Sequence, residues 1–440
     1  MTELDQLRAD LDRIDQRRQK LAPLRKHWQG EPDTAFMSKA SRDALDNRLA
    51  RMSINFPRLL VTSYVDRMNL TGWTGPDGTP DAEAWQRWRA AGMVEGAELV
   101  HTDRLMYGAA YVTVWPEAAG PVPVLDSALT MTTDMDPLTG AVSRAVRTWT
   151  HRGRAHALVI EADSITRWRC DTEDGGAAGD WRPVTPPTLS PWGADGIVPV
   201  VPFIRRQSIG DYDGTSVAAD ILDLTDAENK IMADALVTSE AYARPRRWAT
   251  GLEIEEDDDG NPVDPFARGR SLQSEDPDTR FGQFDPARLD SYADMSATIT
   301  QLVGAMTGLP AHYLGLHGDQ PAAAEGVRAA EAQLTSRVFS ELRAMDRPWA
   351  RVAGLLQLAA DRDRAEATTY TPEWASPEIR TPGQAADAAA KLHGIGVPLA
   401  ALLSNTLGWE PTDVEAAMAA RRGELVERAA GAVAGRVQLS

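Results

Sequence analysis

Residues 216–242 read SVAADILDLTDAENKIMADALVTSEAY, and the fold follows from this stretch together with residues 286–308. In both stretches the apolar residues recur every three or four positions, which predicts amphipathic helices. At about 1.5 Å per residue, the first helix would be roughly 40 Å long. The second ends at Gly308 and Pro310, which are residues that stop a helix. The sequence therefore predicts two long helices with an insertion between them.

The insertion, residues 251–284, has a different composition from the helices. It contains ten acidic residues and three arginines, a net charge of −7, and turn signals at residues 260–262 and 276–278. A small module between two helices that return side by side accounts for this pattern. Its longest acidic run consists of Glu255, Glu256, Asp257, Asp258 and Asp259.

The first helix also carries aspartates away from its apolar stripe. These are Asp220, Asp223, Asp226 and Asp234. Lys230 lies four residues from both Asp226 and Asp234, a spacing that stabilises a helix by a few tenths of a kcal/mol per pair.

Upstream of this helix, residues from about 105 to 207 contain short β-branched and aromatic runs separated by Gly, Pro and Asp, which predicts a β-rich domain. Its clearest hairpin turn is DPLTG at 136–140, because proline presets φ and glycine tolerates positive φ. Residues 3–27 predict an amphipathic helix. The spacing stays helical over residues 40–88, broken by a turn at 75–78.

Downstream, a third long helix is predicted from about residue 321, with Asp319 in the position of a cap. It continues beyond Pro348, which predicts a kink because the proline ring removes one backbone donor. After residue 381 the pattern is helical again. The sequence therefore predicts an α+β protein that is mainly helical.

Composition excludes several classes of protein. The 440 residues predict about three folded units, and the net charge of −18 argues against a general basic surface for nucleic acid. The single Cys170 excludes an intrachain disulfide and a multi-cysteine metal site, and we expect it to be buried. The chain begins without the features of a signal peptide and contains no apolar run of about 20 residues. We therefore expect it in the cytoplasm or in an assembly built there.

The motifs of the common enzyme classes are missing from the sequence. It contains neither a phosphate-binding Gly-x-x-x-x-Gly-Lys-Ser/Thr loop nor Gly-x-Gly-x-x-Gly, His-Glu-x-x-His or Gly-x-Ser-x-Gly. The closest histidine pairs are five residues apart, which does not place two rings on one helical face. We therefore expect no catalytic site, no metal and no cofactor.

Seven short motifs, in this order, resemble those of the portal proteins of tailed double-stranded DNA bacteriophages, in the branch common in phages of actinobacteria. The first is LLVTSYVDRMNLTGW at residues 59–73, which is similar to the family's early helix and strand. The second is HTDRLMYGAAYV at 101–112, which leads into the β-rich part. The others are DPLTG at 136–140, VPVVPF at 198–203, ARPRRWATG at 243–251, PAHYLG at 310–315 and EGVRAAEA at 325–332.

The resemblance implies a portal fold with wing, stem, clip and crown, assembled as a ring, most often of twelve copies, at one capsid vertex with DNA passing through its axial channel. Mapped by order, the parts are a wing at 1–210, a first stem helix at 211–244, a clip at 245–285, a second stem helix at 286–308, a tunnel loop at 309–325, a kinked helix and connector at 326–380 and a crown at 381–440.

The resemblance also implies the partners of the chain. These are further copies of itself, double-stranded DNA in transit without sequence specificity, the terminase packaging motor, a head–tail connector (adaptor) protein, and the major capsid and scaffolding proteins. It implies no membrane, assembly in the host cytoplasm and a final place at the portal vertex of the virion.

On this mapping, the aspartates Asp220, Asp223, Asp226 and Asp234 are candidates to line the channel, because tight phosphate binding would hold DNA in place. The alternative is that they face neighbouring subunits or solvent. The tunnel-loop candidates are His312, His317, Asp319 and Gln320. For the clip, the acids 255–259 are candidates to dock basic partner surfaces, with plain solubility as the alternative.

Two other functions remain open at this point. One is another phage head or connector protein, or a helical scaffold, without a DNA channel, which predicts no ring with an axial hole. The other is an enzyme whose site cannot be recognised in the sequence, such as a hydrolase of the β-rich domain, which predicts turnover by a monomer.

Overall fold

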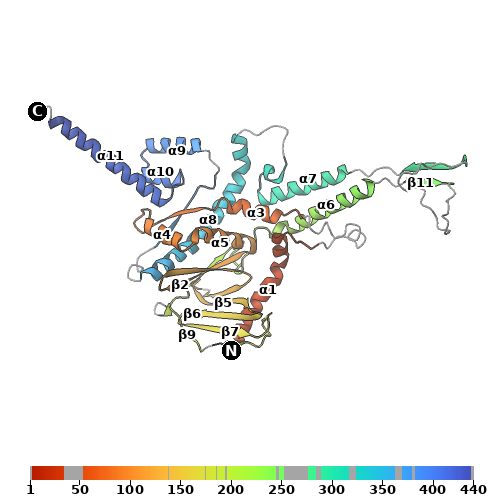
Figure 1. The fold of residues 1–440 in the computed structure, drawn as a ribbon, viewed down its shortest axis with the longest axis horizontal. Coiled ribbons are helices and arrows are strands. Elements are labelled where there is room, and N and C mark those ends of the chain that lie inside the picture. Colours follow the sequence, from red (N-terminus) through yellow and green to blue (C-terminus); the bar gives the residue numbers. More distant parts are fainter. Residues whose placement is uncertain are drawn as a thin grey trace. The chain divides into compact units, whose positions relative to one another are not determined.

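The computed structural model describes residues 2–33, 53–136, 138–173, 175–184, 186–193, 196–243, 247–251, 276–283, 289–316, 324–361, 369–378 and 382–437 (Figure 1). The chain divides into two compact units. The first comprises residues 1–29, 55–222 and 304–440, and the second comprises residues 30–54 and 223–303.

Helices form the start of the first unit. They are α1 (Glu3–Gln29), α3 (Phe56–Val65), α4 (Ala82–Ala90) and α5 (Met93–Tyr107). Asn55 caps α3 by accepting a hydrogen bond of 2.9 Å from the backbone N–H of Arg58, and Asp81 caps α4 in the same way. The helix predicted over residues 3–27 is confirmed as α1.

Two antiparallel sheets follow and confirm the β-rich domain. The smaller contains β2 (Ala109–Glu117), β3 (Gly120–Ser127) and β10 (Val200–Ile204) in the order β10-β2-β3. The larger has the order β4-β5-β6-β7-β8, with β9 paired to β7; its strands are β4 (Met131–Met135), β5 (Val142–His151), β6 (Arg154–Glu161), β7 (Ser164–Cys170), β8 (Arg182–Pro183) and β9 (Thr188–Leu189).

The β4–β5 hairpin turn is the one predicted at residues 136–140. The Asp136 carboxylate accepts hydrogen bonds from the backbone N–H groups of Leu138 (2.7 Å) and Thr139 (3.2 Å). Gly140 has a φ of +69°, a conformation that glycine adopts without steric cost. The turn chemistry was therefore readable from the sequence.

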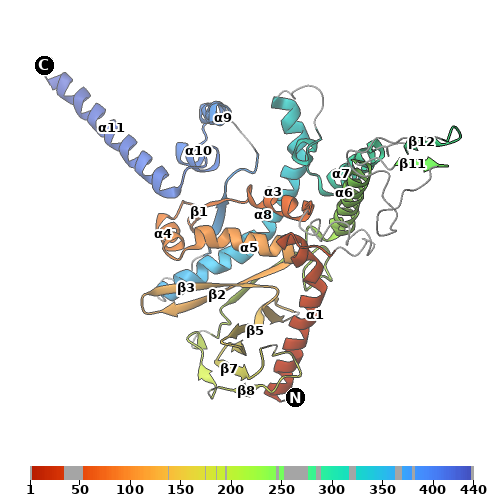
Figure 2. The same ribbon diagram turned by 45° about the vertical axis from the view of Figure 1, so that its right-hand side comes forward.

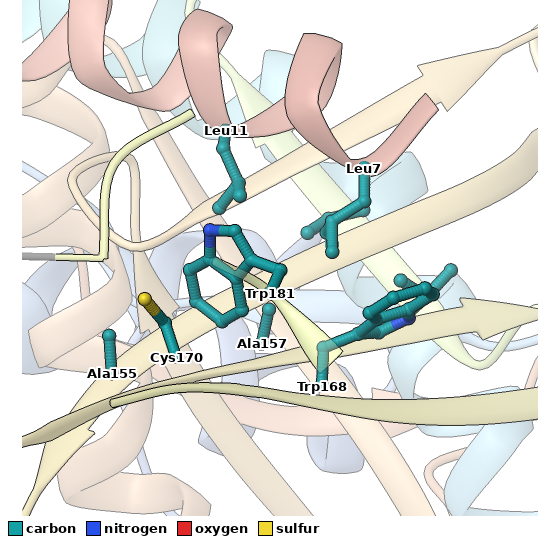
Figure 3. Packing of buried hydrophobic residues seen from close by; sticks show 9 residues of the cluster. Leu7, Leu11, Ala155, Ala157, Trp168, Cys170 and Trp181 are labelled. Atoms are coloured by element: carbon teal, nitrogen blue, oxygen red, sulfur yellow. The ribbon is translucent and has the colours of Figure 1, made fainter. Parts of the chain in front are cut away.

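The core of the larger sheet lies between the sheet and α1, as Figure 3 shows. Leu7 and Leu11 of α1 point toward Trp181, Trp168 and the sheet. Cys170 belongs to the same cluster and is buried, as the sequence predicted for a lone thiol. Burial of these side chains fixes α1 on one face of the sheet.

Helix α8 (Ala324–Ala360) packs with α5 on the smaller sheet. It continues through Pro348, which confirms one long helix, and its ribbon changes direction along its length in Figures 1 and 2. Next to the proline, the fully buried Trp349 contacts Phe203 of the sheet at 4.3 Å between ring centroids and Trp88 at 5.2 Å.

The C-terminal part contains β13 (Thr371–Trp374), α9 (Pro382–Gly394), α10 (Leu399–Asn405) and α11 (Pro411–Val437). Strand β13 pairs antiparallel with β1 (Leu70–Thr74). Residues 70–74 fall in a region whose apolar spacing predicts a helix, so that prediction is wrong there, whereas the helix and strand implied by the resemblance of residues 59–73 correspond to α3 and β1. A strand partner from 300 residues further along the chain is not a local feature of sequence.

The second unit is built on two long helices. These are α6 (Leu222–Ala243), which follows the 3₁₀ turn η3 (Ala219–Ile221), and α7 (Asp290–Thr307). Two short strands, β11 (Arg247–Thr250) and β12 (Arg280–Gln283), pair antiparallel between them. The helix–insertion–helix order is confirmed, although α6 begins six residues later than predicted. No helix among the described residues is long and apolar enough to cross a membrane.

Candidate functional site

Helices α6 and α7 are joined by polar contacts in the second unit. The hydroxyl of Ser296 donates a hydrogen bond of 2.5 Å to Oε1 of Glu228, a residue that is 1% exposed. The hydroxyls of Thr238 and Tyr292 lie 3.2 Å apart. Ile231 on α6 and Val303 on α7 are also buried. Hydrogen bonds between two helices fix their register, whereas aliphatic contacts alone tolerate sliding.

Three of the four candidate channel aspartates lie on one stripe of α6. Asp223, Asp226 and Asp234 are separated by three and eight residues, a spacing that keeps them on one face of an α-helix. Asp223 is exposed and the other two are half-buried. Lys230 falls on the same stripe and forms an ion pair with Asp234. The stripe is therefore acidic but carries one cation.

Asp220 does not belong to this stripe. It is an exposed residue of η3 in the first unit, where it lies at a cavity of about 440 Å³. The same cavity is lined by Arg205, Arg337 and Glu341. Asp220 therefore faces cationic groups of its own unit.

A largely buried ion triad, two members of which line this cavity, joins three elements of the first unit. The Glu341 carboxylate on α8 accepts a hydrogen bond of 2.6 Å from Nη1 of Arg104 on α5 and one of 2.9 Å from Nε of Arg205 after β10. The Arg104 side chain is 2% exposed. Burial acts to raise the pKa of Glu341, but the two guanidinium groups outweigh it and hold that pKa below its usual value.

Helix α8 also holds the C-terminal end of α7. Nη1 of Arg337 donates hydrogen bonds to the carbonyl oxygens of Met306 (2.9 Å) and Thr307 (2.8 Å), both in the last turn of α7. Gly308 then turns the chain with a φ of +73°. The predicted stop at this glycine is confirmed.

The first half of the predicted tunnel loop contains η4 (Ala311–Leu314), which is contacted by Arg67, just after α3, and by Glu331 of α8. Nη2 of Arg67 donates 2.9 Å to the Tyr313 hydroxyl and lies 3.4 Å from the Glu331 carboxylate. Nε2 of His312 is 3.5 Å from the same carboxylate. His312 is therefore a member of a polar cluster that anchors the start of the loop.

The other predicted tunnel-loop residues, His317, Asp319 and Gln320, lie outside the described residues. The clip acids Glu255, Glu256, Asp257, Asp258 and Asp259 lie outside them as well. The described part of the clip is the β11–β12 pair, in which Trp248 is 37% exposed and Phe281 is 41% exposed.

Sequence reasoning missed the anchoring residues around α8. Arg104 lies inside the quoted 101–112 motif, and its charge in an apolar helical context was the available signal. Glu341 and Arg337 gave none, because each is one charged residue among many on a long amphipathic helix. Their partners are remote in sequence, so the pairing appears only in the folded chain.

Comparison with known proteins relates the chain to viral proteins of one kind. It is 29% identical over 368 residues to the portal protein of Mycobacterium phage L5, covering 78% of this chain and 73% of that protein. It is also 29% identical over 372 residues to the portal protein of Mycobacterium phage D29, with the same coverage.

Solved structures with a similar chain include the virion of a native gene transfer agent particle and the neck of that particle computed with C12 symmetry. The identities are 14% and 15%, and the TM-scores are 0.48 and 0.47. Each match covers 85% of this chain and 94% of the other.

The match to a whole family is the decisive comparison. Residues 8–424 match the family of phage portal proteins described as SPP1 Gp6-like, whose members are structural proteins of the virion and not enzymes. The match spans the β-rich domain, both long helices of the second unit and α8. The chain therefore belongs to the SPP1 Gp6-like family of phage portal proteins.

Proposed function

We propose that this chain assembles into a ring of twelve copies at one vertex of the capsid, around an axial channel through which DNA enters and leaves. The observation that carries the proposal is the family match over residues 8–424, together with the order of helix, inserted module, helix and long bent helix. Assembly in the host cytoplasm, on capsid and scaffolding proteins, belongs to the same proposal.

The proposed division of labour follows the described elements. Helices α6 and α7 form the stem, and the β11–β12 pair is the described part of the clip. The β-rich domain with the N-terminal helices forms the wing. Residues 309–325 form the tunnel loop, and the helices after residue 381 form the crown.

A stem lined by acids would let a polyanion slide. Positive side chains on phosphates release counterions and hold DNA, whereas the α6 stripe presents three carboxylates and one amine. In twelve copies the chain's charge of −18 amounts to −216. The resulting repulsion acts within a Debye length of about 8 Å at physiological salt.

A double charge reversal tests the lining. Asp223→Lys with Asp226→Lys should slow DNA packaging or ejection, and more so at low salt, where the new amines bind phosphate most strongly. Glu424→Lys with Glu427→Lys is a matched control, because both glutamates are exposed on α11 and have the same three-residue spacing. Equal rates for the two double variants would mean that the stripe faces neighbours or solvent.

The clip acids at 255–259 are proposed to dock basic surfaces of the terminase and later of the connector. The support is the net charge of −7 in residues 251–284. Reversal of Asp257 and Asp258 to Lys should abolish pull-down of both partners by assembled rings. If pull-down of both partners is unchanged, the acids do not dock them, and the alternative that they only confer solubility is favoured.

Electron microscopy combined with particle mass tests the ring itself. Rings of about twelve subunits with a central hole support the proposal. Monomers alone call for the same measurement after co-expression with the capsid and scaffolding proteins of the same phage. Particles without an axial hole in that second measurement would favour a head or connector protein that conducts no DNA.

A further inference from the structure

One face of the larger sheet gathers positive charge in a chain whose net charge is strongly negative. The register pairs Trp149 on β5 with His156 on β6, His156 with Arg169 on β7, and Arg169 with Arg182 on β8, so these side chains share a face. Residues two positions away along each strand join them. The basic face consists of Arg147, His151, Arg154, His156, Arg167, Arg169 and Arg182 around Trp149.

The opposite face of the same strands is the one packed on α1. Val146, Trp168 and Cys170 alternate with the basic residues and belong to the buried cluster of Leu7 and Leu11. The basic face is consequently directed away from that core. The side chains of Arg154, Arg169 and Arg182 are 53%, 43% and 69% exposed, so a partner can reach them.

Aromatic contacts pack the centre of the basic face around Trp149. The His156 ring stacks on Trp149 with an interplanar angle of 14° and 5.3 Å between centroids. The guanidinium groups of Arg147 and Arg167 each lie 5.6 Å from the centroid of the Trp149 ring. Burial lowers the pKa of His156, and the neighbouring basic side chains lower it further. Arginines held on an aromatic platform lose little freedom when they bind.

Carboxylates offset only part of this charge. Asp126 pairs with Arg147 at 2.6 Å, Asp171 lies 3.5 Å from both Arg154 and Arg169, and Asp180 pairs with Arg182. Among the described residues, these pairs set three carboxylates against four of the five guanidinium groups of the basic face. The basic face therefore keeps a surplus of positive charge.

The composition of the basic face favours a protein partner over a nucleic acid. Leu158 and Ile165 on the same face are half-exposed, and Val184, which bonds the Arg167 backbone, is 43% exposed. Arginine, tryptophan and aliphatic side chains together are typical of protein interfaces. Trp149 is already stacked by His156, so it offers no open platform for a base.

We propose that the basic face binds an acidic surface of a second copy of this chain, as one side of the contact between neighbours in the ring. A closed ring requires a head-to-tail contact between two different surfaces. Copies that each carry −18 repel one another unless the positive charge is concentrated where they meet. This inference rests on the proposed ring and specifies one of its interfaces.

Charge reversal on the basic face tests the inference. Arg167→Glu with Arg169→Glu should lower the subunit association constant by about tenfold or more in 50 mM NaCl, measured by mass photometry of purified full-length protein. The difference from wild type should shrink in 1 M NaCl, where the Debye length is about 3 Å. Arg167→Gln with Arg169→Gln, which removes charge but keeps size, should give an intermediate loss.

The matched control is Arg421→Glu with Arg422→Glu, two exposed arginines on α11 that undergo the same change in charge. This variant should form rings as wild type does, and thermal melting should show that all variants are folded. Normal rings from the Arg167/Arg169 variants would overturn the inference and leave the ring proposal intact. Normal rings with reduced DNA binding would likewise overturn it and assign the face to nucleic acid. Wild-type protein that forms no ring, alone or with its capsid proteins, would refute both proposals.

Discussion

Removing the Glu341 carboxylate should destabilise the first unit more than any surface substitution. Glu341→Ala leaves Arg104, which is 2% exposed, as a buried charge without its carboxylate partner. Breaking a buried ion pair in this way costs about 3–5 kcal/mol. Alanine is a good helix former, so the helix propensity of α8 adds no further loss. The loss in free energy of unfolding therefore measures the effect of leaving the Arg104 guanidinium buried without its partner.

The expected change in melting temperature follows from the size of the unit. For about 330 residues, an unfolding entropy of about 2.1 cal/mol/K per residue gives roughly 0.7 kcal/mol/K. A loss of about 3–5 kcal/mol then lowers the melting temperature by about 4–7 °C. Tryptophan fluorescence reports this unit, because its fully buried tryptophans are Trp73, Trp85, Trp88, Trp192 and Trp349.

Two further variants separate the ion triad from other effects. Glu98→Ala, an exposed glutamate of α5, should change stability by less than about 0.5 kcal/mol. Glu341→Leu combined with Arg104→Met should recover most of the loss, because no charge remains buried and Arg205 still reaches water. A loss below about 1 kcal/mol for Glu341→Ala, or a double variant as unstable as the single one, would refute the reasoning.

The same triad predicts a pH dependence. The pKa of Glu341 is lower in the folded chain than its usual value of 4.5, so the folded state binds the proton less tightly than the unfolded state. The contribution to stability is then complete above pH 4.5 and is lost as the pH falls through the lower folded-state pKa. The gap in melting temperature between wild type and Glu341→Ala should therefore narrow in acid.

Three other substitutions test separate parts of the fold. Gly108→Ala places a Cβ 2.5 Å from the carbonyl carbon of Gly214 at a φ of +84° and should prevent folding. Gly78 has a similar φ of +77° but no atom within 4 Å of the added Cβ, so Gly78→Ala should lower the free energy of unfolding by only about 1 kcal/mol, measured by thermal melting. Leu7→Ala removes a fully buried side chain of the α1 core and should cost about 2–5 kcal/mol in a urea titration; a cost below about 1 kcal/mol would contradict the packing in Figure 3. Burial raises the pKa of Asp126 from 3.8 to about 6 although Arg147 opposes it, so the folded state holds this proton more tightly and stability should fall as the pH rises from about 4 to 6. Asp126→Asn should make the melting temperature less dependent on pH over that range, and an equal pH dependence in wild type and variant would exclude the effect.

The regular elements were predictable because their signals are local. Apolar spacing located α1, α6, α7 and α8, and Gly308 marked the end of α7. The DPLTG turn was readable because Asp136 and Gly140 contribute through their own backbone geometry. The family resemblance rested on motif order and was confirmed by the match over residues 8–424.

Strands with remote or atypical partners were not predictable in the same way. Strand β1 pairs with β13, so its strand character depends on residues 371–374. Strand β3 contains Pro121 and Pro123, which conceal a strand pattern; prolines are tolerated there because β3 lies at the edge of its sheet. The periodicity of a short segment contains no information about a hydrogen-bond partner that lies far along the chain.

For the candidate site, the sequence by itself determined the acidic spacing on α6, the charge of the clip segment and the helix–insertion–helix order. Only the structure decided that Asp220 belongs to η3 rather than to α6 and that His312 lies beside Glu331. It also brought Arg104, Arg205 and Glu341 into one triad, and it aligned arginines from four strands into one basic face. The physical reason is that helix faces follow from short-range periodicity, whereas charge pairing and strand register depend on which distant segments the hydrophobic core brings together.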